Sequence, residues 1–161
     1  MHLRIVGTLL AMALAVPNAS AEDTTAVSIG AVLGRFQLEQ LQPFSQYCEA
    51  ALPERAEEFR SASSQLRSNL ESLAPEIDEA ARSADTKPIS QQEFDTALGG
   101  IRQVVDEALV QAKQLPADAL CLRVLARLRD GTVENLRGLM RKSLEDYQSR
   151  LRSREESTAG N

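Results

Sequence analysis

Apolar residues recur along this chain with the period of an α-helix, and no alternating strand pattern lasts more than a few residues. Turn and proline signals divide the pattern into four helical segments. Their expected ranges are about 26–51, 53–84, 90–115 and 119–152. Amphipathic helices of this length joined by short turns predict an all-α protein, an antiparallel up-down four-helix bundle.

The second segment has the most regular apolar face. Its apolar or small side chains are spaced by four and three residues in turn, at Phe59, Ser63, Leu66, Leu70, Leu73 and Ile77. This heptad spacing suits either the inward face of an antiparallel bundle or a coiled-coil seam for a partner. We take the inward face as the first interpretation, because the pattern lasts only about three heptads.

The third segment begins at a clear helix signal. Ser90 and Glu93 match a capping box, in which each side chain accepts a hydrogen bond from the other residue's backbone amide. We expect its apolar residues to face the core together: Phe94, Leu98, Ile101, Val104, Val105, Leu109 and Ala112.

Proline and glycine residues predict where the segments bend, pack or end. Pro43 and Pro75 lie inside helical patterns and should bend or interrupt them, because proline lacks the amide donor and clashes with the preceding turn. The Gly99-Gly100 pair predicts close helix packing or a kink. Gly131 can end one helix before another starts, which would divide the last segment and make five helices.

The first residues, Met1–Ala21, have the pattern of an export signal. Arg4 supplies a positive start, a short apolar stretch follows, and Ala19-Ser20-Ala21 makes a small-residue cleavage site. No later apolar run reaches membrane length. We therefore expect an exported protein, with the periplasm as its compartment. The expected parts are a cleaved signal at 1–21, a single helical-bundle domain at 22–152 and a disordered polar tail at 153–161.

The chain has two cysteines, Cys48 and Cys121. Oxidised pairs persist in exported proteins, so we predict a structural disulfide between them. The bundle topology agrees with this pairing. The first helix ends and the fourth begins at the same end of an up-down bundle, which brings the two cysteines together.

Several classes of chemistry are excluded by what the sequence lacks. The single histidine, His2, falls in the predicted signal, so the mature chain has none. Its absence excludes triads and metal or haem sites that need an imidazole. No calcium loop, glycine-rich phosphate loop or nucleophile elbow occurs either. We expect no catalytic residue, no metal site and no cofactor, and therefore a non-enzymatic protein.

Charge is distributed unevenly along the chain. The whole sequence has a net charge of −5, which argues against a nucleic-acid partner. The last segment is nevertheless basic, and its side chains could meet an acidic partner or an anionic envelope component. The alternative is that they are solvated or pair with the protein's own acidic helices. The candidate residues are Arg123, Arg127, Arg137, Arg141 and Lys142, with Arg150 further along.

These features predict a small exported non-enzymatic helical protein that acts through protein or envelope contacts. We expect a protein partner, no nucleic acid and no membrane span, with peripheral envelope contact left open. Three alternatives also remain open. One is an inhibitor or immunity-type protein that blocks one exported enzyme through the acidic surface of its first helices. Another is a carboxylate-based envelope hydrolase, and the last is an oligomeric scaffold that uses the heptad face.

Overall fold

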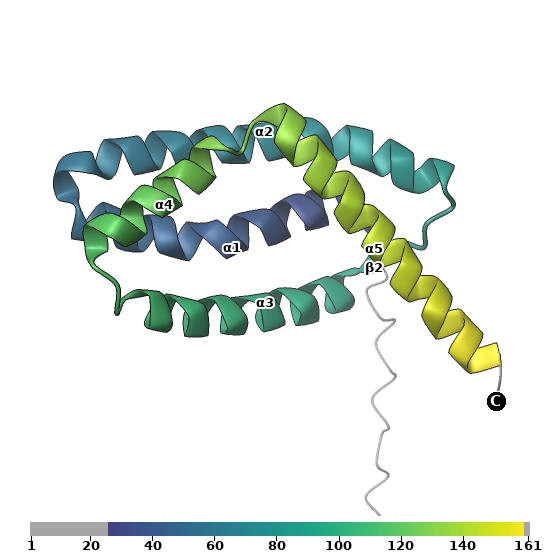
Figure 1. Ribbon diagram of the computed structural model, residues 1–161. Coiled ribbons are helices and arrows are strands. Elements are labelled where there is room, and N and C mark those ends of the chain that lie inside the picture. The colour runs from purple at the N-terminus through teal and green to yellow at the C-terminus, as the bar shows by residue number, and fades with distance from the viewer. Residues whose placement is uncertain (1–25, 160–161) are drawn as a thin grey trace, which may run out of the picture.

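The computed structural model describes residues 26–159, and helices make up nearly all of this part of the chain (Figure 1). The predicted signal at 1–21 lies outside the described residues. The helices are α1 (Ile29–Ala51), α2 (Ala56–Ser83), α3 (Gln91–Ala112), α4 (Ala117–Arg129) and α5 (Val133–Ala159). A 3-10 turn, η1 (Pro53–Arg55), precedes α2, and two short strands, β1 (Ala26–Val27) and β2 (Ile89–Ser90), pair antiparallel.

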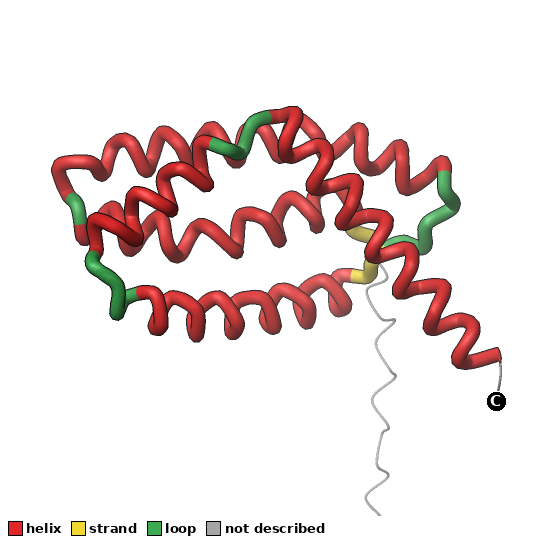
Figure 2. Tube along the Cα trace, viewed as in Figure 1, coloured by secondary structure: helices red, strands yellow, loops and turns green. Residues whose placement is uncertain are grey.

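The helices follow the predicted up-down order, in the five-helix form. α1, α2 and α3 run in alternating directions, and α4 with α5 takes the place of the fourth helix (Figure 1). The chain leaves the helical pattern around Gly131, where α4 and α5 meet at an elbow (Figure 2). The all-α prediction, the division at this glycine and the bundle arrangement are therefore confirmed.

The central helix is α1, which contacts all four other helices. α2 and α4 pack on one side of it, and α3 lies on its other side, in contact mainly with α1 and the short strands (Figure 1). α3 has no comparable contact with α2, α4 or α5, so the side of α3 that faces away from α1 is left without a helix packed on it. This arrangement determines where the candidate site lies.

The heptad face of α2 forms the middle of the core. Its large side chains, Phe59, Leu66, Leu70, Leu73 and Ile77, are at most 2% exposed. The inward-face interpretation is therefore confirmed, and the coiled-coil seam for a partner is wrong. An oligomeric scaffold would have to use another surface.

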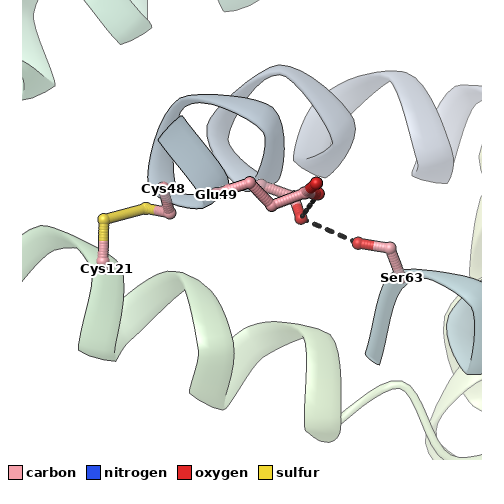
Figure 3. The surroundings of a disulfide bond; sticks show 5 residues. Cys48, Glu49, Ser63 and Cys121 are labelled. Carbon is pink, nitrogen blue, oxygen red and sulfur yellow. Dashed lines mark hydrogen bonds between the residues drawn. A yellow bond between two sulfur atoms is a disulfide. The ribbon is translucent and has the colours of Figure 1, made fainter. Parts of the chain in front are cut away.

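The predicted disulfide joins Cys48 on α1 to Cys121 on α4, and both residues are completely buried. Polar contacts lie on the α2 side of the same stretch of α1 (Figure 3). The hydroxyl of the buried Ser45 lies 2.8 Å from that of Ser63 and donates to Glu49 at 3.4 Å. The heptad position that carries a serine thus makes a satisfied polar contact inside the core.

Both helices that contain an internal proline continue without a break. α1 runs through Pro43 and α2 runs through Pro75, so of the two expected effects, a bend or an interruption, the interruption does not occur. The two helices have the most extensive contact of any pair in the fold. Burial of their facing apolar sides outweighs the one backbone hydrogen bond that each proline removes.

Close helix packing occurs at Gly30, and not at the predicted Gly99-Gly100 pair. A Cβ atom on Gly30 would lie 2.2 Å from the backbone oxygen of Ala74, whereas nothing lies within 4 Å of one on either Gly99 or Gly100. Asp78 of α2 also caps the start of α1 here. Its carboxylate accepts from the Ser28 hydroxyl at 2.6 Å and from the Gly30 amide at 2.8 Å.

We expect Gly30→Ala to destabilise the protein by about 1 to 3 kcal/mol, because the new methyl group would meet backbone that cannot move without separating α1 from α2. The matched control is Gly99→Ala, which adds the same methyl group in open space on a helix. It should raise stability by up to about 1 kcal/mol through helix propensity. Urea unfolding followed by circular dichroism measures both. Equal effects of the two substitutions would contradict the close contact at Gly30.

Two predictions about the ends of helices have different outcomes. The capping box is present: Glu93 N donates to the Ser90 hydroxyl at 3.2 Å, and Ser90 N donates to the Glu93 carboxylate at 2.9 Å. The predicted disorder of the tail is wrong for 153–159, because α5 continues to Ala159. Within this last stretch, the hydroxyls of Ser153 and Ser157 each donate to the carbonyl four residues earlier.

Candidate binding groove

A groove of about 740 Å³ lies between α1, α3 and α5, next to β2. Its apolar lining includes Leu33, Phe36, Ile89, Phe94, Ile101 and Leu151. Amides and hydroxyls stand among these side chains, at Gln37, Gln40, Gln92, Thr96 and Ser143. An apolar hollow with a few polar groups is the usual composition of a binding site.

Two aromatic residues join α1 and α3 in the groove. The rings of Phe36 and Phe94 have their centroids 5.8 Å apart and are tilted by 31°. Both rings are only half-buried, so each still presents apolar surface to the groove. Aromatic surface of this kind contributes strongly to protein interfaces.

The α5 side of the groove is held to the turn after α2. The Tyr147 hydroxyl donates to the carbonyl of Lys87 at 3.3 Å, and the Gln148 amide donates to the Thr86 hydroxyl at 2.7 Å. Burial raises the pKa of Tyr147, and the nearby charge of Glu93 raises it further. The phenol therefore remains protonated and acts as a hydrogen-bond donor at neutral pH.

Charged groups at the groove are of both signs. Glu93 is engaged in the capping box, and hydrogen bonds from the backbone and the hydroxyl of Ser90 hold its pKa below the usual value. Asp146 and Arg150 line the α5 side, are exposed, and form no ion pair with a described residue. The groove therefore has charges available to a partner on its α5 wall.

The α3 wall extends beyond the enclosed part of the groove. Ala97 and Ile101 line it, and Val104 and Ala108 continue the same face with spacings of four, three and four residues. Val104 is 66% exposed, so its predicted place in the core is wrong. The neighbouring Val105 is the residue that packs inward. α3 thus has two apolar stripes, and only one of them is covered.

The basic residues predicted as an interaction surface divide into two groups. Arg137 and Arg141 both pair with Glu76 of α2, with nitrogen-to-oxygen distances of 2.9 and 2.6 Å. These hydrogen bonds hold the pKa of Glu76 below its usual value. The remaining predicted residues are exposed and form no ion pair with a described residue: Arg123, Arg127, Lys142 and Arg150. Only this second group is available for an acidic partner.

A buried carboxylate, which the sequence did not indicate, ties α3 to α1. Glu39 is 7% exposed and accepts two hydrogen bonds from Arg102 of α3, both at 3.1 Å. Arg35 pairs with the same carboxylate at 2.5 Å. The hydrogen bond from Arg102 is the main reason that the pKa of Glu39 is lowered, although burial acts in the opposite direction.

We expect Glu39→Gln to cost about 1 to 3 kcal/mol at pH 7, because it leaves two arginines without their carboxylate. A lowered folded-state pKa gives stability that is complete above the unfolded pKa and is lost as the pH falls through the folded value. The difference between wild type and variant should therefore shrink between about pH 5 and pH 3. Urea unfolding of the wild type and the variant at about pH 5 and about pH 3 measures this difference in stability. A difference independent of pH would contradict the ionised, paired carboxylate.

Comparison with models of known protein families, with curated proteins and with solved structures finds no match for this chain. Within residues 26–159, no three His, Cys, Asp or Glu side chains are placed to hold a metal ion together. None of the helices within residues 26–159 combines the length and the hydrophobicity that a bilayer span requires.

Proposed function

We propose that this chain is an exported, non-enzymatic protein that acts by binding a polypeptide in the groove between α1, α3 and α5. The observation that carries this proposal is the uncovered second stripe of α3 beside an open apolar groove. The buried polar groups of the fold are already satisfied, since no buried side-chain nitrogen or oxygen in the described residues lacks a hydrogen-bond partner. A contiguous apolar surface on an otherwise satisfied protein is typical of a protein-binding site.

The buried disulfide supports export. Cys48 and Cys121 are completely enclosed and paired, and such pairs persist in oxidising compartments such as the periplasm. The predicted signal at 1–21 points to the same compartment. Peripheral contact with the envelope would use the exposed Arg123, Arg127 and Lys142.

The chemistry of the groove supports binding over a carboxylate-based hydrolase. A catalytic acid needs a raised pKa, so that it holds a proton near neutral pH. The pKa of Glu93 is lowered instead, and its carboxylate is occupied by the helix cap. Tyr147 stays protonated and bonded to a backbone carbonyl, so it serves as a structural donor.

The acidic surface of α2 gives less support to an inhibitor that works by charge. Glu57 pairs with Arg60, and Glu58 pairs with both Arg55 and Arg129. Hydrogen bonding to Arg55 is the main cause of the lowered pKa of Glu58. Since these carboxylates already have cationic partners, they offer little net negative charge to a basic enzyme.

A photo-crosslinking amino acid at Gln40, on the exposed rim of the groove, tests the proposal in intact cells. The matched control position is Ser68, which is also exposed but lies on α2 outside the groove. We expect a polypeptide adduct at Gln40 and none at Ser68 after irradiation of the cell envelope. Loss of the Gln40 adduct in a Val104→Glu background would assign the contact to the α3 wall. Equal adducts at both positions, or none at Gln40, would refute binding in the groove.

A further inference from the structure

We propose that the polypeptide in the groove is α3 of a second copy of this chain, so that the protein is a two-fold symmetric dimer. The inference rests on the proposed function, because it names the partner of the same groove. Three observations support it: the two stripes of α3, the self-complementary order of residues along the exposed stripe, and the opposite charges of the two walls.

The first observation is that α3 has the pattern of a helix held between two partners. Its inward stripe contains Leu98 and Val105, each 7% exposed, which pack toward α1. Its outward stripe, Ala97, Ile101, Val104 and Ala108, keeps heptad spacing over about three turns and is mostly uncovered. A surface helix needs only one apolar stripe to pack on its own core, so the second one is available to a partner.

The second observation is that the outward stripe matches itself when two copies run antiparallel. If the two-fold axis passes between Arg102 and Gln103, each Ala97 lies opposite the partner's Ala108 and each Ile101 lies opposite the partner's Val104. Small residues then meet small residues, and branched residues meet branched ones. No side chain blocks the approach at the exposed Gly100, beside the stripe. The two helices can therefore pack closely.

The third observation is charge complementarity between the walls of the groove. Within 91–112, α3 has four acidic residues and one basic residue, Arg102, which is paired with Glu39. The opposite wall, on α5, has exposed Asp146 and Arg150 in its lining, and the segment 143–154 has three basic and two acidic residues. In the antiparallel register no acidic residue of α3 lies opposite another: Glu93, Asp95, Asp106 and Glu107 face Ala112, Val110, Gly99 and Leu98. A second α3, with its excess of acidic residues, thus meets a wall with a small excess of basic residues, and no two acidic residues lie opposite each other along the seam.

The α5 wall also has an apolar residue for this partner. Leu139 is 44% exposed and lies on the same face of α5 as Ser143, Asp146 and Arg150, which line the groove. A second α3 would cover Leu139 together with Val104. Two of the large hydrophobic side chains exposed in the monomer would then be buried.

The mass of the exported, disulfide-bonded chain in solution tests the proposal. We expect the mass of two chains by sedimentation equilibrium at micromolar concentration. Val104→Glu should raise the dissociation constant by about tenfold or more, because it places an unpaired carboxylate in the seam. The matched control is Leu122→Glu, at a residue that is 55% exposed on α4 and outside the stripe. The control should remain a dimer, and circular dichroism should show that both variants are folded.

Crosslinking of engineered cysteines checks the register independently of folding defects. A mixture of Ala97→Cys and Ala108→Cys chains should form a disulfide-linked pair between the two variants, whereas Ala97→Cys alone should not. A pair formed by Ala97→Cys alone would overturn the antiparallel register. A single-chain mass up to millimolar concentration would overturn the dimer.

The failure of this inference is distinguishable from failure of the proposed function. If the chain is a monomer but Gln40 still crosslinks to a different polypeptide, the dimer is refuted and binding in the groove stands. If the chain is a dimer that Val104→Glu leaves intact, then the dimer uses another face and this inference is wrong. If Gln40 crosslinks only to a second copy, and Val104→Glu abolishes the adduct and the dimer together, both are supported.

Discussion

Replacing Cys48 and Cys121 together with alanine is expected to lower the free energy of unfolding by about 2 to 5 kcal/mol. The disulfide closes a loop with a sequence separation of 73 residues. Chain-entropy estimates for a loop of that size give about 4 kcal/mol, because the crosslink restricts the unfolded chain. Alanine is preferable to serine, since both positions are completely buried and a hydroxyl there would have no certain partner.

Urea unfolding of the wild type with and without a thiol reductant measures this effect. The reductant should lower the wild-type stability toward that of the double alanine variant, and it should leave the variant unchanged. Helical content should persist in the variant under native conditions, because α4 also buries Leu120, Val124, Leu125 and Leu128. A wild-type curve that does not respond to reductant, together with a variant as stable as the wild type, would contradict the role of the disulfide.

Leu70→Ala is expected to lower the free energy of unfolding by about 2 to 5 kcal/mol, as is usual when a buried leucine is truncated. Leu70 is 2% exposed in the middle of α2. Its Cβ atom lies 3.6 Å from where a Cβ on Gly34 would be, so α1 already passes close to it. The backbone of α1 can therefore do little to fill the space that the substitution leaves, and the cavity adds to the lost burial.

Leu66→Ala should have a loss in the same range, for a related reason. The Leu66 side chain is 2% exposed and packs directly over Gly131 at the elbow between α4 and α5. Leu122→Ala is the matched control, because it removes the same atoms from a side chain that is 55% exposed, and it should change stability by no more than about 0.5 kcal/mol. Urea unfolding of the three variants measures these losses of stability. Losses at Leu66 and Leu70 as small as at Leu122 would show that the heptad face is not the core.

Most predictions that depend on neighbouring residues in the sequence were accurate, apart from the interruptions at the two internal prolines and the disorder of the tail. The heptad face from Phe59 to Ile77, the capping box at Ser90 and the break at Gly131 all have the expected structure. Each depends on side-chain spacing or backbone geometry within a few turns of helix. The disulfide was also predictable, because the chain has only two cysteines and the up-down topology brings them to one end.

Predictions that needed the positions of other helices were less accurate. Val104 and Val105 are adjacent and equally apolar, yet only Val105 is buried. Their periodicity shows that α3 has apolar residues on more than one face, but it does not show which face α1 covers. The glycines also depend on distant residues. A Cβ atom added to Gly30 would meet the backbone of Ala74, whereas one added to Gly99 would have nothing within 4 Å. The sequence does not show which glycine is tightly packed, because the contacting atoms belong to a segment far away along the chain.

The candidate groove was not predicted, for this reason. Its lining comes from α1, α3 and α5, which are separated along the chain and contribute only a few residues each. The basic residues of α5 show the same dependence, since Arg137 and Arg141 both pair with Glu76 while Lys142 is exposed and forms no ion pair with a described residue. Pairing is decided by which residues of α2 lie beside that part of α5.

The sequence by itself determined the helical class, most of the core, the disulfide and the order of the helices. These follow from apolar periodicity, capping signals, turn positions and the small number of cysteines, all of which are visible along the chain. Only the tertiary structure decided which apolar stripe of α3 stays uncovered, which arginines remain available and where the groove opens. Those outcomes depend on the packing of α1 against its neighbours, because burial is a property of two surfaces in contact and not of one segment alone.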